Sequence, residues 1–286
     1  MGHLIIRLVA MRKSSSFQPL KKKNNSILPG LAVAAVVFGV LAAGGYLVFL
    51  SIYGGVTRDK TTLCPVEGPR SVTSIVIDRT DAISVITKAD IEVQINNLLA
   101  SAQKDQEFTL FTVDSIERNT LKPLVTVCSP GNPDDVDPLY ASKEIVRKRW
   151  IENFKLPLEQ VLRDILSLQE AEFSPIMESI QSITITHFSE IQRKEVPRKI
   201  IIVSDLLQNS RTISFYKNKP NFEKFQESLF SKGLNPDLRN VDIEIWLINR
   251  NSKAQAVEAE ILAFYGAWVS VHGGRLVRLL RLSGIN

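Results

Sequence analysis

The stretch Ser74–Ser84, SIVIDRTDAIS, decides the fold of this chain. It begins with apolar, β-branched residues, which are typical of a buried strand, and it continues into two aspartates, Asp78 and Asp81. A single aspartate after a strand is commonly explained as the cap of the following helix. Two aspartates with Thr80 between them indicate that the end of this strand binds something.

Hydrophobic strands alternate with amphipathic helices along the rest of the chain. Beyond the strand at 71–77, further strands are expected at 107–114, 121–129, 198–205, 240–249 and 275–282. Helices are expected at 87–103, 142–168 with a kink near Pro157, 174–188, 221–233 and 253–273. This alternation predicts a Rossmann-like α/β fold, a mostly parallel sheet with helices on both faces. Ligands of such sheets bind beyond the carboxyl ends of the strands, where Asp78 and Asp205 fall.

Residues 27–53, ILPGLAVAAVVFGVLAAGGYLVFLSIY, predict a transmembrane helix. The segment contains no charged residue, and at about 1.5 Å rise per residue it crosses the roughly 30 Å apolar core of a bilayer. A cleavable signal peptide is the alternative, but its apolar region usually covers only about 7–15 residues. Ala35, Gly39 and Ala43 recur every four residues, a spacing that allows two spans to pack as a homo-oligomer; a simple anchor is the plainer interpretation.

Charge is distributed unevenly between the tail and the folded part. Six of the 35 basic residues, and none of the 30 acidic ones, lie in residues 1–53. The remainder is close to neutral, so no nucleic-acid partner is expected. Because Lys21, Lys22 and Lys23 precede the span, the positive-inside rule predicts a cytoplasmic N-terminus and an extracytoplasmic C-terminal domain. In a Gram-negative bacterium the span would lie in the inner (plasma) membrane and the domain in the periplasm.

The chain divides into four parts on this interpretation. They are a basic cytoplasmic tail at 1–26, the transmembrane helix at 27–53, a linker at 54–70 and the α/β domain at 71–286. Cys64 and Cys128 both fall on the exported side, where an oxidising compartment permits a disulfide. Two buried free thiols are the alternative, and the sequence does not decide between them. No spaced set of Cys and His residues predicts structural zinc.

Three separated segments carry candidate cation ligands: DRTDA (78–82), SPIME (174–178) and SDLL (204–207). Together they resemble the von Willebrand factor type A (VWA) family over about residues 71–282. The metal-ion-dependent adhesion site of that family combines an Asp-x-Ser-x-Ser loop, a threonine that opens a later helix and an aspartate that ends a later strand. The matching residues here are Asp78, Thr80, Ser174 and Asp205. The second loop serine is Ala82 in this chain, and Asp81 has no counterpart in the family pattern.

The resemblance implies a divalent cation, Mg²⁺ with Mn²⁺ or Ca²⁺ as substitutes, held by Asp78, Thr80, Ser174 and Asp205. Carboxylate and hydroxyl oxygens suit such hard cations, which also retain bound water. In the family, an acidic side chain of a partner commonly fills the open position. We therefore expect a non-enzymatic VWA-like module that binds a protein partner as part of a bacterial membrane or envelope complex.

The alternative is an enzyme, a metal-assisted phosphoesterase that uses Asp78 and Asp81. Phosphatases of the haloacid-dehalogenase type carry their second aspartate two residues after the first, and that position is Thr80 here. A Gly-x-Ser-x-Gly elbow for hydrolysis through a serine is also absent from the sequence.

Phe215 and Tyr216, in the segment after Asp205, are either partner contacts or core residues, and the sequence leaves both open.

Overall fold

The structure, a computed structural model, describes residues 27–53, 56–79, 83–113, 120–136, 142–167, 172–249 and 257–284. The chain forms two compact units, residues 1–55 and 56–286.

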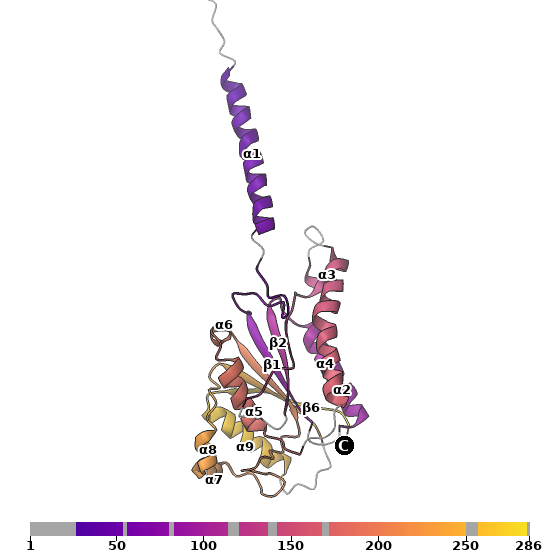
Figure 1. The fold of residues 1–286 in the computed structure, drawn as a ribbon, viewed down its shortest axis with the longest axis vertical. Helices are drawn as coiled ribbons and strands as arrows, with labels where there is room; N and C mark the ends of the chain where they lie inside the picture. Colours follow the sequence, from indigo (N-terminus) through magenta and orange to yellow (C-terminus); the bar gives the residue numbers. More distant parts are fainter. Residues whose placement is uncertain are drawn as a thin grey trace, which may run out of the picture. The chain divides into compact units, whose positions relative to one another are not determined.

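The first unit contributes one helix, α1 (Ile27–Tyr53; Figure 1). Among the described residues it is the only helix that is long and apolar enough to cross a membrane. None of its most apolar stretch, Ala32–Phe49, is buried by other parts of the chain. A core helix of a globular domain would be covered, so α1 fits the anchor of a single-pass membrane protein.

The second unit is built on a six-stranded sheet with the order β3-β2-β1-β4-β5-β6. Figure 1 labels three of these strands, β1, β2 and β6. The strands are β1 (Ser71–Asp78), β2 (Gln106–Val113), β3 (Val125–Cys128), β4 (Arg198–Ser204), β5 (Val241–Leu247) and β6 (Arg275–Arg281). Only β3, at one edge, runs antiparallel to its neighbour among these strands. The order is that of doubly wound α/β sheets, whose ligand crevice lies where the strand order reverses, here between β1 and β4. The predicted mostly parallel α/β fold is confirmed.

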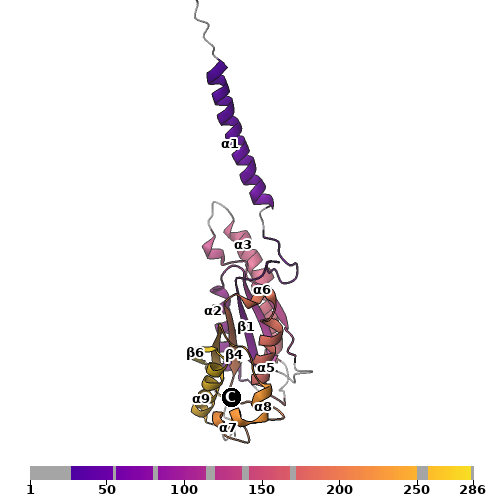
Figure 2. The same ribbon diagram turned by 90° about the vertical axis from the view of Figure 1, so that its left-hand side faces the viewer.

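Helices cover both faces of the sheet. One face carries α2 (Val85–Ala100) and a long helical run made of α3 (Lys143–Trp150), a π-helical segment η3 (Ile151–Lys155) and α4 (Leu156–Ser167). The other face carries α5 (Ile176–Ser182), the π-helical η4 (Ile183–His187), α7 (Phe222–Glu227) and α9 (Glu258–Val271). Figure 2 shows α2 and α5 on opposite sides of β1. The short elements are η2 (Pro133–Asp135), α6 (Ile191–Lys194) and α8 (Leu229–Gly233).

The central strands are buried on both faces, which explains their continuous apolar sequences. In β1, Ile75 and Ile77 pack on the side of α2 and α4, whereas Val72 and Val76 face α5 and α9. This alternation follows from the two-residue period of a strand. Asp78, two residues after Val76, therefore belongs to the face that α5 covers.

The kink expected near Pro157 is a π-helical segment directly before it. Proline has no amide hydrogen and cannot complete the regular helical bond to the preceding turn. The π segment Ile151–Lys155 absorbs this interruption. Its Phe154 is fully buried, with its ring centroid 5.5 Å from that of Phe108 in β2.

Candidate functional site

Asp78 ends β1 at the centre of the sheet and has no exposed surface. The register of β1 and β4 pairs Ile77 with Val203, so the next residues, Asp78 and Ser204, leave the sheet side by side. The Ser204 hydroxyl donates a hydrogen bond of 2.7 Å to Oδ2 of Asp78. Strand pairing therefore fixes the Asp78 carboxylate from one side.

Ser174 reaches the same carboxylate oxygen from a third segment. Its hydroxyl donates a hydrogen bond of 2.8 Å to Oδ2 of Asp78, and its backbone pairs in both directions with Asn209, over 2.7 and 2.9 Å. Ser174 lies one residue before the N-cap position of α5. The N-cap position is Pro175, and the Ser174 hydroxyl binds the carboxylate instead of a backbone amide.

Asp205 follows β4 directly and is buried. Its Oδ1 accepts a hydrogen bond of 3.0 Å from the amide of Leu207. This bond closes a tight local turn. Leu206 between them has a φ of 62°, a left-handed conformation that a bulky residue rarely adopts. Its amide donates to the Ser204 hydroxyl over 2.8 Å. Backbone strain of this kind is concentrated at functional sites, and nothing in the sequence signalled it.

Thr80, the remaining predicted ligand, lies outside the described residues, as do Asp81 and Ala82. The described part of the site therefore consists of Asp78, Ser174 and Asp205. The second carboxylate of the alternative phosphoesterase reading, Asp81, has no described position.

Gln208 and Glu178, two residues that the sequence analysis did not assign to the site, connect the segment after β4 to α5. Gln208 is fully buried. Its Oε1 accepts a hydrogen bond of 3.1 Å from the Met177 amide, and its Nε2 donates one of 2.7 Å to the Glu178 carboxylate. Burial raises the pKa of the Glu178 carboxyl above its usual value, and hydrogen bonds from its own amide, Gln208 and Ser210 only partly offset this. The only sequence feature that could have pointed to Glu178 is its position as an acidic residue in the first turn of α5.

Tyr265 of α9 brings an unsatisfied donor to the same region. The side chain has no exposed surface, and its hydroxyl has no hydrogen-bond partner within the described parts of the chain. Burial raises the pKa of this hydroxyl well above its ordinary value, and the charges of Glu178, Asp78 and Asp205 raise it further. Buried polar atoms without partners are rare in proteins. The described candidate ligands Asp78, Ser174 and Asp205 offer oxygen atoms only, which is the donor type that hard divalent cations prefer.

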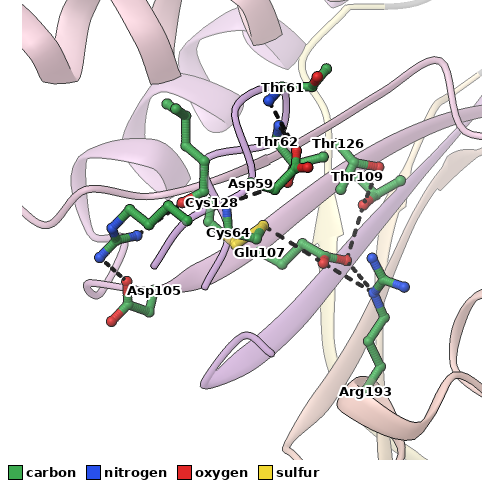
Figure 3. The surroundings of a disulfide bond; sticks show 12 residues. Asp59, Thr61, Thr62, Cys64, Asp105, Glu107, Thr109, Thr126, Cys128 and Arg193 are labelled. Carbon is green, nitrogen blue, oxygen red and sulfur yellow. Dashed lines mark hydrogen bonds and ion pairs between the residues drawn. A yellow bond between two sulfur atoms is a disulfide. The ribbon is translucent and has the colours of Figure 1, made fainter. Parts of the chain in front are cut away.

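A second buried polar cluster surrounds Glu107, near the start of β2 and away from the carboxyl ends of the strands (Figure 3). The Glu107 carboxylate has no exposed surface. Nε of Arg193 donates hydrogen bonds to its Oε1 and Oε2 over 2.9 and 3.0 Å, and Nε2 of His187 lies 2.9 Å from Oε1. Burial raises the pKa of Glu107, but the hydrogen bonds and charges of His187 and Arg193 outweigh it, so the pKa is lowered. His187 is therefore a buried structural partner of Glu107.

Cys64 and Cys128 form a disulfide beside Glu107 (Figure 3), which resolves the alternative that the sequence left open. The bond joins the segment before β1 to the end of β3, and Sγ of Cys64 lies 3.9 Å from Oε2 of Glu107. These three residues form the only group of metal-ligand type among the described His, Cys, Asp and Glu side chains. Since a disulfide offers no thiolate, the cluster is structural.

The aromatic pair after Asp205 belongs to the core. Phe215 is buried and its ring lies 5.0 Å from that of Phe264. Tyr216 is half-buried and packs against the same apolar cluster. Of the two alternatives for these residues, core packing is therefore the one observed.

Comparisons with known proteins give structural similarities only. No protein-family model and no curated protein matches the chain. Among solved structures, VWA2 of Sulfolobus acidocaldarius, a paralog of ArnB, matches with 13% identity and a TM-score of 0.42, covering 75% of this chain and 41% of that one. An aerotolerance-related membrane protein of Bacteroides fragilis matches with 8% identity and a TM-score of 0.39, covering 75% and 92%. BatB of Bacteroides thetaiotaomicron matches with 11% identity and a TM-score of 0.36, covering 75% and 91%.

This chain spans about two fifths of the Sulfolobus protein's chain. With TM-scores below 0.5, these similarities carry no argument about function. The fold rests instead on the strand order and on the helices that cover both faces, which agree with the family resemblance found in the sequence. The second unit therefore has the doubly wound α/β architecture that the resemblance to the von Willebrand A-type family implies.

Proposed function

We propose that this chain is a membrane-anchored module that binds a protein partner through a divalent cation at the carboxyl end of its sheet. The observation that carries the proposal is the convergence of Ser174 and Ser204 on one buried oxygen of Asp78. Asp205 follows Ser204 directly, so residues from three separate segments meet at the point where the strand order reverses. In doubly wound sheets this is the place of the ligand crevice.

The cation would be held by Asp78, Thr80, Ser174 and Asp205. All four side chains offer oxygen atoms, which favours Mg²⁺, with Mn²⁺ or Ca²⁺ as substitutes. A bound ion would offset the negative charge that Asp78, Asp205 and Glu178 place around Tyr265. With its remaining open position, the ion would attract a carboxylate of the partner.

The partner would be another component of a membrane or envelope complex. Helix α1 supplies the anchor in the lipid bilayer, and the lysines before it favour a domain outside the cytoplasm. The Cys64–Cys128 disulfide supports the same placement, because disulfides persist in oxidising compartments such as the periplasm. The small residues Ala35, Gly39 and Ala43 would allow the spans of two copies to pack closely in the membrane.

The proposed activity is binding and not catalysis. Oδ2 of Asp78 already accepts two hydrogen bonds, from Ser174 and Ser204. These bonds hold the carboxylate in place and reduce the nucleophilicity of that oxygen, which suits a ligand of a cation better than a group that attacks phosphorus.

Calorimetric titration of Mg²⁺ and of Mn²⁺ into the full chain in detergent micelles tests the cation site. We expect saturable binding by the native protein and none by Asp78→Ala or Asp205→Ala. Asp242→Ala is the matched control, because Asp242 lies near the start of β5, where it pairs with Arg275 over 2.6 Å. If the native protein shows no binding heat at millimolar Mg²⁺ or Mn²⁺, the cation is excluded.

Cross-linking in membranes followed by mass spectrometry tests the partner. Native protein should capture a membrane-complex component that Asp78→Ala fails to capture. The phosphoesterase alternative predicts the reverse, namely hydrolysis of p-nitrophenyl phosphate that Asp78→Ala abolishes while the cross-links persist.

A further inference from the structure

An aromatic cavity of about 630 Å³ lies among α7, α8, α9 and the segment that precedes α7. These three helices gather at one end of the domain in both views (Figures 1 and 2). The buried rings of Phe215, Phe225 and Phe264 line it, and the rings of Phe225 and Phe264 lie 5.2 Å apart. Its rim is polar, with Lys219, Lys224 and Glu260 among the lining residues. The volume lies within the roughly 300–1,000 Å³ of protein pockets that bind small molecules or side chains.

The wall of this cavity is tied to the proposed cation site by backbone pairing. Asn209 pairs with Ser174 on one side and with Ser214 on the other. Because paired backbones lie about 4.8 Å apart, Ser214 is roughly 10 Å from Ser174. The next residue, Phe215, lines the cavity, and its amide donates to the Gln208 carbonyl over 2.9 Å. One bound protein segment can therefore reach both places.

The segment 211–224, which contributes much of the cavity lining, carries more basic than acidic residues. Residues 211–224 contain one acid, Glu223, and four exposed cations, Arg211, Lys217, Lys219 and Lys224. Lys219 pairs with Glu260 over 3.2 Å. Within the described part of the chain, the other three cations form no ion pair. A ligand with negative charge around an apolar side chain would complement both the rim and the lining.

We propose that this cavity is an anchor pocket for an acidic segment of a protein partner. The segment inserts one aromatic side chain against Phe225 and Phe264 and places its carboxylates near Lys217 and Lys224. Buried aromatic anchors contribute most of the affinity of many interfaces, while the surrounding charges select the partner and speed association. The contact goes beyond the cation site, because none of its groups requires an ion.

Binding of a dye-labelled synthetic peptide, Glu-Asp-Trp-Asp-Glu with blocked ends, to the full chain in micelles tests this pocket. Fluorescence anisotropy is measured in EDTA, so that cation binding plays no part. We expect the peptide to bind at least about tenfold more tightly than two relatives, one with alanine in place of tryptophan and one with lysines in place of the acids.

Two variants that change only exposed positions locate the contact. Thr212→Trp should fill the cavity from its rim, and Lys224→Glu should reverse the charge there; each should weaken peptide binding about tenfold. Lys232→Glu, an exposed lysine of α8 outside the cavity, is the matched control and should bind normally.

The proposal is overturned if no peptide binds at millimolar concentration, if the three peptides bind equally, or if Thr212→Trp and Lys224→Glu bind as the native chain does. It is also overturned if tryptophan amide alone binds as tightly as the acidic peptide, since the pocket would then serve a small ligand. Asp78→Ala should retain peptide binding, and Lys224→Glu should retain Mg²⁺ binding, so failure of the pocket and failure of the cation site give different results.

Discussion

The hydroxyl of Ser174 donates a hydrogen bond of 2.8 Å to Oδ2 of Asp78, although 96 positions of the chain separate the two residues. Both side chains are fully buried. Ser204 donates to the same oxygen over 2.7 Å. One carboxylate therefore links the end of β1, the end of β4 and the segment before α5. Substitution of Asp78 tests the contribution of these shared hydrogen bonds.

Asp78→Ala should lower the free energy of unfolding by about 2–4 kcal/mol, because it leaves the buried hydroxyls of Ser174 and Ser204 without their acceptor. Asp78→Asn should cost less, since its amide oxygen still accepts hydrogen bonds, yet it should abolish Mg²⁺ binding. Urea unfolding of the chain in micelles measures both effects. Equal losses for Asp78→Ala and the control Asp242→Ala would contradict the role of Asp78 as a shared acceptor.

Glu178 should make the cation-free protein less stable as the pH rises. Its pKa is raised in the folded state, mainly by burial, so the folded protein holds this proton more tightly than the unfolded chain does. The resulting stabilisation is complete below the pKa of the unfolded chain and is lost as the pH rises through the folded pKa. Glu178→Gln should remove this dependence when unfolding is followed between pH 4 and 8 in EDTA. Glu223→Gln, on the exposed side of α7, should leave the pH profile unchanged.

Arg193 should stabilise the domain by compensating the buried charge of Glu107. The pKa of Glu107 is lowered, so its contribution to stability is present above the pKa of the unfolded chain and is lost as the pH falls through the folded pKa. Arg193→Ala should cost about 3–5 kcal/mol near neutral pH, because it removes one partner of a buried ion pair. Adding Glu107→Gln to Arg193→Ala should recover part of that loss in thermal unfolding. A double variant less stable than Arg193→Ala would show that the carboxylate is not what Arg193 compensates.

The Cys64–Cys128 disulfide should contribute substantially to stability. Its cysteines are 64 positions apart, and the chain-entropy model assigns about 4 kcal/mol to a loop of this length. Replacing both cysteines by serine, or adding a reductant to the native protein, should lower the unfolding free energy by a similar amount. The serine variant itself should not respond to the reductant; if it does, the reductant acts elsewhere in the assay.

The regular elements could be predicted because their patterns are local. The continuous apolar run that ends at Asp78 and the run from Arg198 to Ser204 identified the two central strands. Helix α2 followed from the spacing of Ile91, Ile95 and Leu99, all of which are buried. Boundaries were less certain: the strand expected at 121–129 is only Val125–Cys128.

The geometry around the site could not be predicted in the same way. Leucine is not a turn residue, so its sequence position gave no indication that Leu206 adopts a left-handed conformation after Asp205. A helix was expected from Ser174 onward, but the sequence did not reveal that Ser174 pairs with the backbone of Asn209 and donates a hydrogen bond to Asp78. Gln208 has no recognisable motif, and only its burial between Met177 and Glu178 reveals its function.

The sequence alone determined the apolar span, the alternation of strands and helices, and the position of Asp78 and Asp205 at strand ends, because these features depend on composition and on periods of a few residues. Only the tertiary structure decided which groups meet: Ser174 and Ser204 on one oxygen of Asp78, Cys64 with Cys128, and Phe215 within an aromatic cavity. These contacts between distant residues depend on the order and register of the strands. Order and register are set by the burial of entire sheet faces and not by any local sequence pattern.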